Sequence, residues 1–203
     1  MNPRFVALAL ALALLLLLAA APSHAQHGGG ASAMPATAAP ADARQFDFLI
    51  GQWELEVRPK VSGLAAMIHG APRLLGSWKA WRAFDGFGVQ DELRIMDSSG
   101  NPQSLTSSQR VYAEAERQWK ISTLNVYQAR YSTSTARWQN GEMQTSGQGT
   151  DAEGKDYQSR TRYFEIGKDA FKMTQDRSYD EGNTWDEGVL AIDAKRVSAT
   201  APH

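Results

Sequence analysis

The sequence predicts an all-β domain: an antiparallel up-and-down barrel of about ten strands, of the lipocalin (calycin) kind. Turn signals recur at nearly regular intervals after Trp53, and the runs between them are rich in β-branched and aromatic residues. The links between these runs are short, so consecutive strands are expected to pair with one another. A meander of this length closes most readily into a barrel, because closure removes exposed sheet edges.

The turns divide the chain into strands. The Asn-Gly pair in "QNGE" (139–142) is the strongest hairpin signal, because both turn positions need a positive φ. Further turns are expected at 97–101, 114–117, 151–155, 167–170 and 179–184. The predicted strands lie near 53–58, 77–85, 87–96, 103–112, 118–126, 128–138, 142–150, 155–165, 170–177 and 185–194.

Alternation of side chains indicates half-buried strands. In 118–126, Trp119, Ile121 and Thr123 share one face, and Lys120 and Ser122 share the other. The run 159–166 is ambiguous, because each of its two faces combines polar and aromatic side chains. The pattern alone leaves open which face of that strand points inward.

Two stretches interrupt the strand pattern. Residues 43–51 have Phe46, Leu49 and Ile50 at helical spacing and end on Gly51, which predicts a short helical turn that plugs one end of the barrel. Residues 61–76 are apolar but broken by glycines, and we interpret them as a lid segment over a barrel mouth.

The N-terminal region is expected to lie outside the fold. Arg4 precedes an apolar run over 5–21, and small residues lead up to Ala25, which is typical of a cleaved signal peptide over 1–25. A disordered linker is predicted over 26–43, the barrel domain over 44–196 and a flexible tail over 197–203. The mature protein is then expected to be periplasmic or secreted, without stable membrane insertion.

Composition narrows the function classes. The formal net charge is −1, which favours neither a nucleic-acid partner nor an anionic membrane surface. The chain has no cysteine, which excludes disulfides, thiol catalysis and cysteine-ligated metals. No zinc-binding histidine motif is present, and we expect neither a metal nor a cofactor. Composition does not predict an oligomeric state.

Three motifs carry a resemblance to a known group. They are "FDFLIGQWELEVR" (46–58), "FDGFGVQDEL" (84–93) and "RSYDEGNTWDEG" (177–188). Together they resemble a bacterial family known as a domain of unknown function, which is similar in pattern to lipocalin-like barrels. The resemblance implies the fold and the class of function, namely binding of a small molecule inside the barrel.

The same resemblance suggests one structural role and weakens one alternative. By similarity to the calycin barrels, Trp53 is expected to pack across one end of the barrel as a plug. The haem-binding branch of those barrels needs an axial histidine. Here the predicted domain contains only His69, which lies in the lid, so haem is not favoured.

The candidate ligand-binding residues are Trp119, Tyr163, Arg160, Arg162 and Glu92. Arg160 and Arg162 share one strand face, and if that face is interior they would hold a carboxylate or phosphate; if it is exterior, they are solvated charges. Aromatic linings suit apolar ligands, although aromatics in small barrels are more often core. Of the adjacent pair formed by Asp91 and Glu92, one side chain is expected to face inward and meet an arginine.

The stretch "SYDEGNTWDEG" (178–188) is interpreted as the last hairpin. Asp180 is expected to accept turn amides, Gly182 to take a positive φ, and Trp185 to pack into the core, so all three are structural. A calcium loop is not favoured, because Gly182 comes one position too late and no helices flank the loop.

The sequence therefore predicts an exported barrel that binds a small, partly apolar or anionic molecule. Two alternatives stay open. One is a barrel enzyme, a hydrolase or isomerase with an acid or base in the cavity. The other is a cell-envelope interaction protein with a filled core. Binding is favoured over catalysis, and a hollow interior would distinguish the first two from the third.

Overall fold

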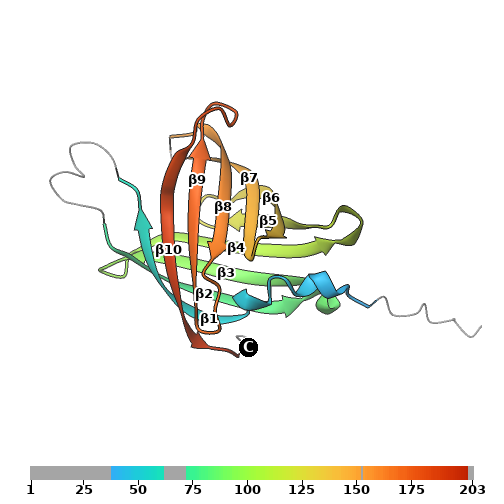
Figure 1. Cartoon of the computed structure of the whole chain (residues 1–203). Helices are drawn as coiled ribbons and strands as arrows, with labels where there is room; N and C mark the ends of the chain where they lie inside the picture. Colours follow the sequence, from blue (N-terminus) through green and yellow to red (C-terminus); the bar gives the residue numbers. More distant parts are fainter. Residues whose placement is uncertain (1–37, 62–71, 152, 201–203) are drawn as a thin grey trace, which may run out of the picture. The chain divides into compact units, whose positions relative to one another are not determined.

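The computed structural model describes residues 38–61, 72–151 and 153–200, which form a closed antiparallel β-barrel of ten strands (Figure 1). Each strand pairs with its neighbours in sequence, and β10 pairs with β1 to close the barrel. The predicted fold class is thus confirmed. The strands are β1 (Gly51–Pro59), β2 (Leu74–Ala83), β3 (Gly88–Asp97), β4 (Pro102–Ala113), β5 (Gln118–Asn125), β6 (Arg130–Gln139), β7 (Glu142–Thr150), β8 (Asp156–Phe164), β9 (Ala170–Ser178) and β10 (Asp186–Ser198).

The observed strands agree with the predicted ranges to within a few residues at most ends. One difference concerns the predicted lid over 61–76, because β2 already begins at Leu74. Residues 62–71, which make up most of that segment and include His69, lie outside the described residues.

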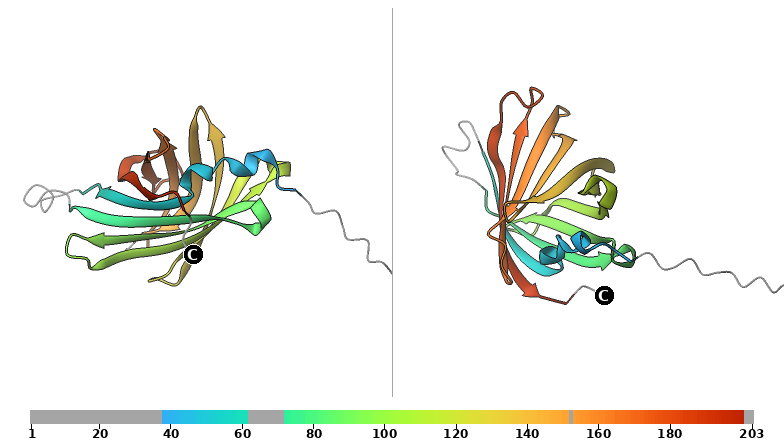
Figure 2. Two further views of the ribbon diagram at one scale, coloured as in Figure 1. Left: turned by 90° about the horizontal axis from the view of Figure 1, so that it is seen from below. Right: turned by 45° about the vertical axis from the view of Figure 1, so that its right-hand side comes forward.

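The segment before β1 folds as short 3-10 turns, η1 (Ala41–Arg44) and η2 (Asp47–Leu49), and η1 begins inside the range predicted as linker. Ala43, Phe46 and Leu49 are fully buried. The ring of Phe46 lies 4.9 Å from that of Trp119, at the start of β5, and 6.1 Å from that of Tyr163, at the end of β8. These contacts place the segment, blue in Figure 2, over the barrel end where odd-numbered strands start.

Two further 3-10 turns, η3 (Phe84–Gly86) and η4 (Glu114–Glu116), connect strands at the same end of the barrel. Among the residues that the structure describes, no helix is long and apolar enough to cross a membrane.

Large apolar side chains fill this end, which we call the aromatic end. Its fully or almost fully buried members include Phe46, Trp53, Trp78, Trp119 and Phe171. Burial of large aromatic side chains, with ring pairs in edge-to-face geometry such as Trp53 and Phe171 at 4.7 Å, stabilises a core strongly. The aromatic end is therefore a packed core.

Trp53 joins the N-terminal segment to the barrel. Its indole Nε1 donates a hydrogen bond to the carbonyl of Leu49 at 2.8 Å. The guanidinium of Arg196, from β10, lies 4.0 Å from the centre of the Trp53 ring and donates to the carbonyls of Ile50 and Phe48 at 2.6 and 3.1 Å. Residues from both ends of the described chain thus close the same end of the barrel.

Candidate functional site

The opposite half of the interior is hollow. A cavity of about 300 Å³, which we call the lumen, lies inside β4 to β9. Most of its lining side chains carry hydroxyl or amide groups, among them Thr106, Thr123, Asn125, Ser132, Thr145, Ser159, Thr161 and Gln175. The lumen shares Arg130, Ser132, Gln148 and Tyr157 with a mouth of about 580 Å³. A hollow of this size suits a small molecule.

The local sequence explains why this half is hollow. Inward positions of β5, β6 and β7 carry small residues there, and the register aligns Thr123 with Ser132 and Ser134 with Gly147. A Cβ at Gly147 would come within 2.7 Å of the Ser134 Cβ, so glycine permits close packing of β6 on β7. Small side chains at facing positions leave the space that aromatic side chains fill at the other end.

A buried ion pair lies between the aromatic end and the lumen. Asp91 is 1% exposed, forms an ion pair with Arg110, and accepts a hydrogen bond from the Trp78 indole at 2.8 Å. Arg110 is 4% exposed, lines the lumen, and lies 5.2 Å from the centre of the Phe46 ring. Burial lowers the pKa of Arg110, whereas Tyr163 acts in the opposite direction. Arginine nevertheless stays charged, because its pKa starts above about 12.

Arg177 supplies a second cation to the lumen. Its Nε donates to the Gln175 side-chain oxygen at 3.2 Å, and Gln175 in turn contacts the Thr161 hydroxyl at 3.5 Å. The Arg177 guanidinium lies 4.2 Å from the centre of the Tyr157 ring. None of the ion pairs in the described part of the chain involves Arg177, although its charge is one of the causes that lower the pKa of Asp151. The guanidinium is thus oriented by Gln175 and Tyr157 without a direct ion pair.

Two of the five predicted ligand-binding residues point into the barrel. Trp119 is fully buried in the aromatic end, where its indole donates to the Gln45 side chain at 3.1 Å, and it does not line the lumen. Tyr163 is largely buried, also contacts Phe46, and does line the lumen. The two side chains are interior, but Tyr163 alone of this pair reaches the cavity.

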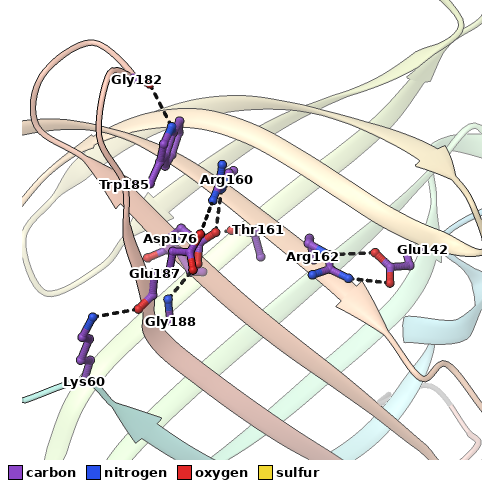
Figure 3. A network of polar contacts seen from close by, with 11 residues as sticks. Lys60, Glu142, Arg160, Thr161, Arg162, Asp176, Gly182, Trp185, Glu187 and Gly188 are labelled. Carbon is purple, nitrogen blue, oxygen red and sulfur yellow. Dashed lines mark hydrogen bonds and ion pairs between the residues drawn. The ribbon is translucent and has the colours of Figure 1, made fainter.

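Arg160 and Arg162 lie on the outer face of β8, so the alternative in which they line the interior is wrong (Figure 3). The inward positions of this strand belong to Thr161 and Tyr163, and successive side chains point to opposite faces. Arg162 donates two hydrogen bonds, of 2.9 and 2.7 Å, to the Glu142 carboxylate. These bonds raise the pKa of Arg162 and lower that of Glu142.

Arg160 belongs to a separate outer network. It contacts Asp176 at 2.7 Å and Glu187 at 3.2 Å. Lys60, just after β1, donates to the Glu187 carbonyl at 3.1 Å (Figure 3). These contacts join β8, β9 and β10 to the end of β1 on the outside of the barrel.

Glu92 also faces outward, where its carboxylate lies 3.4 Å from Arg94. Its neighbour Asp91 takes the inward position and meets an arginine, as expected for one of the pair. The expectation that Glu92 lines the cavity is wrong because the inward parity of β3 runs through Val89 and Asp91.

The hairpin between β9 and β10 lies at the mouth of the lumen. Asp180 accepts hydrogen bonds from the Thr184 amide and hydroxyl at 2.8 and 2.6 Å and from the Ser178 hydroxyl at 2.7 Å. These bonds lower the pKa of Asp180 to about 2. Gly182 has a φ of 91° and donates its amide to the Ser178 hydroxyl. Ser178 and Glu181 are among the residues that line the mouth.

Trp185 does not pack into the core, contrary to the sequence expectation. Its ring is only partly buried, its indole donates to the Gly182 carbonyl at 3.0 Å, and Arg160 lies 4.4 Å from its ring centre. The inward positions of β10 belong to Ile192 and Ala194, and Leu190 and Asp186 pair with the lumen residues Gln175 and Arg177. Counting back by twos therefore reaches Asp186, and Trp185 falls on the outer face.

Sequence reasoning missed Arg110, Arg177 and Gln175. A signal for the last two is present in the sequence, because apolar Phe171 and Met173 alternate with polar Lys172 and Thr174, and continuing by twos reaches Gln175 and Arg177. The same argument from Tyr112 reaches Arg110 on β4. These polar residues lie on the same strand faces as the core residues. The inward face of each strand is thus apolar in the packed end and polar in the cavity.

The described structure is similar to that of the S-type phycobiliprotein lyase CPES from Guillardia theta. The TM-score is 0.50 at 10% sequence identity, over 76% of this chain and 94% of that chain. A second solved structure, EF1p2_mFAP2b bound to DFHBI, covers 77% of this chain and 99% of that chain at 9% identity, and its TM-score of 0.38 is too low to support an argument. No family model and no curated protein matches the sequence.

These findings define the class of the protein by its fold. The chain is a closed ten-strand barrel of the lipocalin-like kind, and at 10% identity the similarity extends to the fold alone. The resemblance of its three sequence motifs to a bacterial domain of unknown function stays a prediction.

Proposed function

We propose that this protein binds a small polar molecule in the lumen of its barrel. The observation that carries the proposal is a cavity of about 300 Å³ that joins a mouth and contains the guanidinium of Arg177, held by Gln175 and Tyr157. A few oriented polar groups in a concave site are typical of small-molecule binding. The hydroxyl-rich lining favours a polar ligand over the partly apolar one that the aromatic content of the sequence indicated.

Binding is better supported than the two alternatives. Within the described lining of the lumen, the charged side chains are arginines, and none of the residues is an aspartate, glutamate or histidine that would serve as a general acid or base. Glu92, an acidic candidate for the cavity, and Arg162 lie on the outer face. The interaction-protein alternative needs a filled interior, whereas this half of the barrel is hollow.

The proposal includes export, on the sequence alone. The predicted signal peptide over 1–25 would deliver the barrel to the periplasm or the exterior after cleavage following Ala25. Intact-mass analysis of the protein purified from its natural host tests this: a mature chain starting at Gln26 is expected, and a chain that retains residues 1–25 would contradict it.

The binding site is tested with a pair of matched variants. Ser132→Phe puts a ring into the lumen, whereas Ser122→Phe puts the same ring on the exposed outer face of β5. The probe is 8-anilinonaphthalene-1-sulfonate, followed by its fluorescence. We expect saturable binding to the unchanged protein and to Ser122→Phe, and at least roughly tenfold weaker binding to Ser132→Phe. Equal affinity for the two variants would reject the lumen as the site.

A further inference from the structure

The charge of the lumen points to the class of its ligand. Arg110, Arg130 and Arg177 are its charged lining residues among those described. Asp91 neutralises Arg110 from outside the cavity, and Arg130 at the rim donates to the Thr150 carbonyl at 3.1 Å. Arg130 and Arg177 form no ion pair in the described chain, so the lumen keeps an excess of positive charge. A cleft of one sign with low-dielectric walls concentrates ions of the opposite sign.

Arg177 is prepared to bind a carboxylate. Its Nε donates to the Gln175 side chain, and the guanidinium lies 4.2 Å from the centre of the Tyr157 ring, so the two contacts fix the orientation of the group. Its terminal Nη atoms have no hydrogen-bond partner in the described part of the chain. A guanidinium held in this way presents donors that match the two oxygens of a carboxylate.

The remaining lining indicates hydroxyl groups on the ligand. The Thr145 hydroxyl is buried and has no hydrogen-bond partner within the described residues. A buried polar atom without a partner costs free energy, which a ligand hydroxyl would remove. A hydrocarbon chain in the same place would leave this hydroxyl unsatisfied.

We propose that the lumen selects a small hydroxylated carboxylate, with its carboxylate on Arg177 and its hydroxyl groups toward the interior threonines and serines. The inference rests on the proposed function and specifies the ligand class for that same site. Asp156 and Glu181 line the outer mouth and not the lumen, so the positive region begins inside the rim.

Three probes distinguish recognition of the carboxylate from recognition of the hydroxyl groups. D-Gluconate carries both a carboxylate and hydroxyl groups, D-sorbitol has the hydroxyl groups without the carboxylate, and hexanoate has the carboxylate without the hydroxyl groups. By isothermal titration calorimetry, we expect gluconate to bind at least about tenfold more tightly than either of the others, because each lacks hydrogen bonds that the lumen offers. Equal affinities for the three probes would overturn the assignment of ligand class.

The role of Arg177 in binding the carboxylate is tested by Arg177→Gln, with Arg162→Gln as its control. Both replace a partly exposed arginine, on adjacent strands, but the first faces the lumen and the second faces outward. Arg177→Gln is expected to weaken gluconate roughly tenfold or more and to leave sorbitol within about twofold, whereas Arg162→Gln changes neither. If Arg177→Gln fails to fold, Arg177→Lys is used instead. Lysine keeps the positive charge but lacks the paired N–H donors of the guanidinium, so a smaller loss of gluconate affinity is expected. An unchanged gluconate affinity in the folded Arg177 variant overturns Arg177 as the anchor.

The same experiment distinguishes failure of this inference from failure of the proposed function. If sorbitol or hexanoate binds as tightly as gluconate and Ser132→Phe blocks them all, the lumen is the site and the ligand class is wrong. If the probes bind equally to Ser132→Phe and Ser122→Phe, the lumen is not the site, and both proposals are wrong.

Discussion

The aromatic end and the lumen are built from the same ten strands but differ in how their polar atoms are satisfied. At the aromatic end, the indole nitrogens of Trp53, Trp78 and Trp119 each donate a hydrogen bond, and all three rings are almost fully buried. In the lumen, small side chains leave a cavity, and the Thr145 hydroxyl is buried without a partner. One end has the properties of a core and the other those of a binding site.

The difference indicates that the aromatic end stabilises the barrel and that the lumen serves binding. A packed and satisfied region supplies most of the stability, so the other region is free to retain a cavity and unneutralised charge at modest cost. Substitutions at the aromatic end should therefore lower stability without changing affinity, and substitutions in the lumen should lower affinity without destabilising the fold. The predictions that follow test this separation, from the largest expected effect to the smallest.

Asp91→Leu should destabilise the protein most, because it leaves Arg110 buried without a counter-charge. Loss of one partner of a buried ion pair costs about 3–5 kcal/mol. Urea denaturation measures the free energy of unfolding. The double variant Asp91→Leu with Arg110→Met removes both charges and should recover most of the loss; a single variant within about 1 kcal/mol of the unchanged protein would contradict the role of the pair.

Phe46→Ala should cost about 3 kcal/mol, since it removes a fully buried ring between the N-terminal segment and Trp119. Affinity for 8-anilinonaphthalene-1-sulfonate should stay unchanged when measured well below the melting temperature. Val197→Ala, at a side chain that is 61% exposed, is the control and should change stability by less than about 0.5 kcal/mol. A loss of affinity in the folded Phe46 variant would mean that the two regions are coupled.

Thr145→Val should act in the opposite direction and stabilise the free protein by about 1 kcal/mol. The substitution keeps the shape of the side chain and removes a buried hydroxyl that has no partner in the described structure. Gluconate affinity should fall in the same variant. Thr135→Val, on the outer face of β6 and not in the lining of the lumen, is the matched control, and equal stability changes in the two variants would argue against an unsatisfied lumen.

Asp180→Asn should have the smallest effect, a decrease of a few degrees in melting temperature at neutral pH. The depressed pKa of Asp180, about 2, means that the carboxylate stabilises the fold fully above its ordinary pKa near 3.9 and loses this effect as the pH falls through about 2. Thermal melts should therefore show a constant difference between pH 5 and 8 that shrinks below pH 4. A difference that persists undiminished at pH 2 would rule out the carboxylate charge as its cause.

The sequence predicted the fold well because its turn residues are unambiguous. The Asn-Gly pair at 140 and 141 and the turn at 179–184 predict hairpins, and the structure has both, between β6 and β7 and between β9 and β10. The predicted strand 118–126 agrees with β5 (Gln118–Asn125), since Trp119 and Ile121 oppose lysine and serine. Here a single observation, the period of two, decides which side chains are buried.

The candidate site was predicted less well, because its interior is itself polar. On β8, each face combines polar and aromatic residues: Arg160 and Arg162 lie on the face of Phe164, and Thr161 lies on the face of Tyr163. The alternation of side chains therefore could not show which face points inward. Of the two aromatic residues predicted to line the cavity, Trp119 instead fills the packed end. Arg177 was overlooked because a charged residue in a strand usually indicates the solvent-exposed face. Its inward position becomes clear only when the alternation is followed along β9 from a buried apolar residue such as Phe171.

The most direct test of the division between the two regions is a two-dimensional NMR titration with 8-anilinonaphthalene-1-sulfonate. Indole N–H signals report the aromatic end, and backbone amides of Thr123, Ser132 and Thr161 report the lumen. We predict large shifts for the three lumen amides and none for the Trp53 and Trp119 indoles. Shifts of those indoles with unmoved lumen amides would contradict the account.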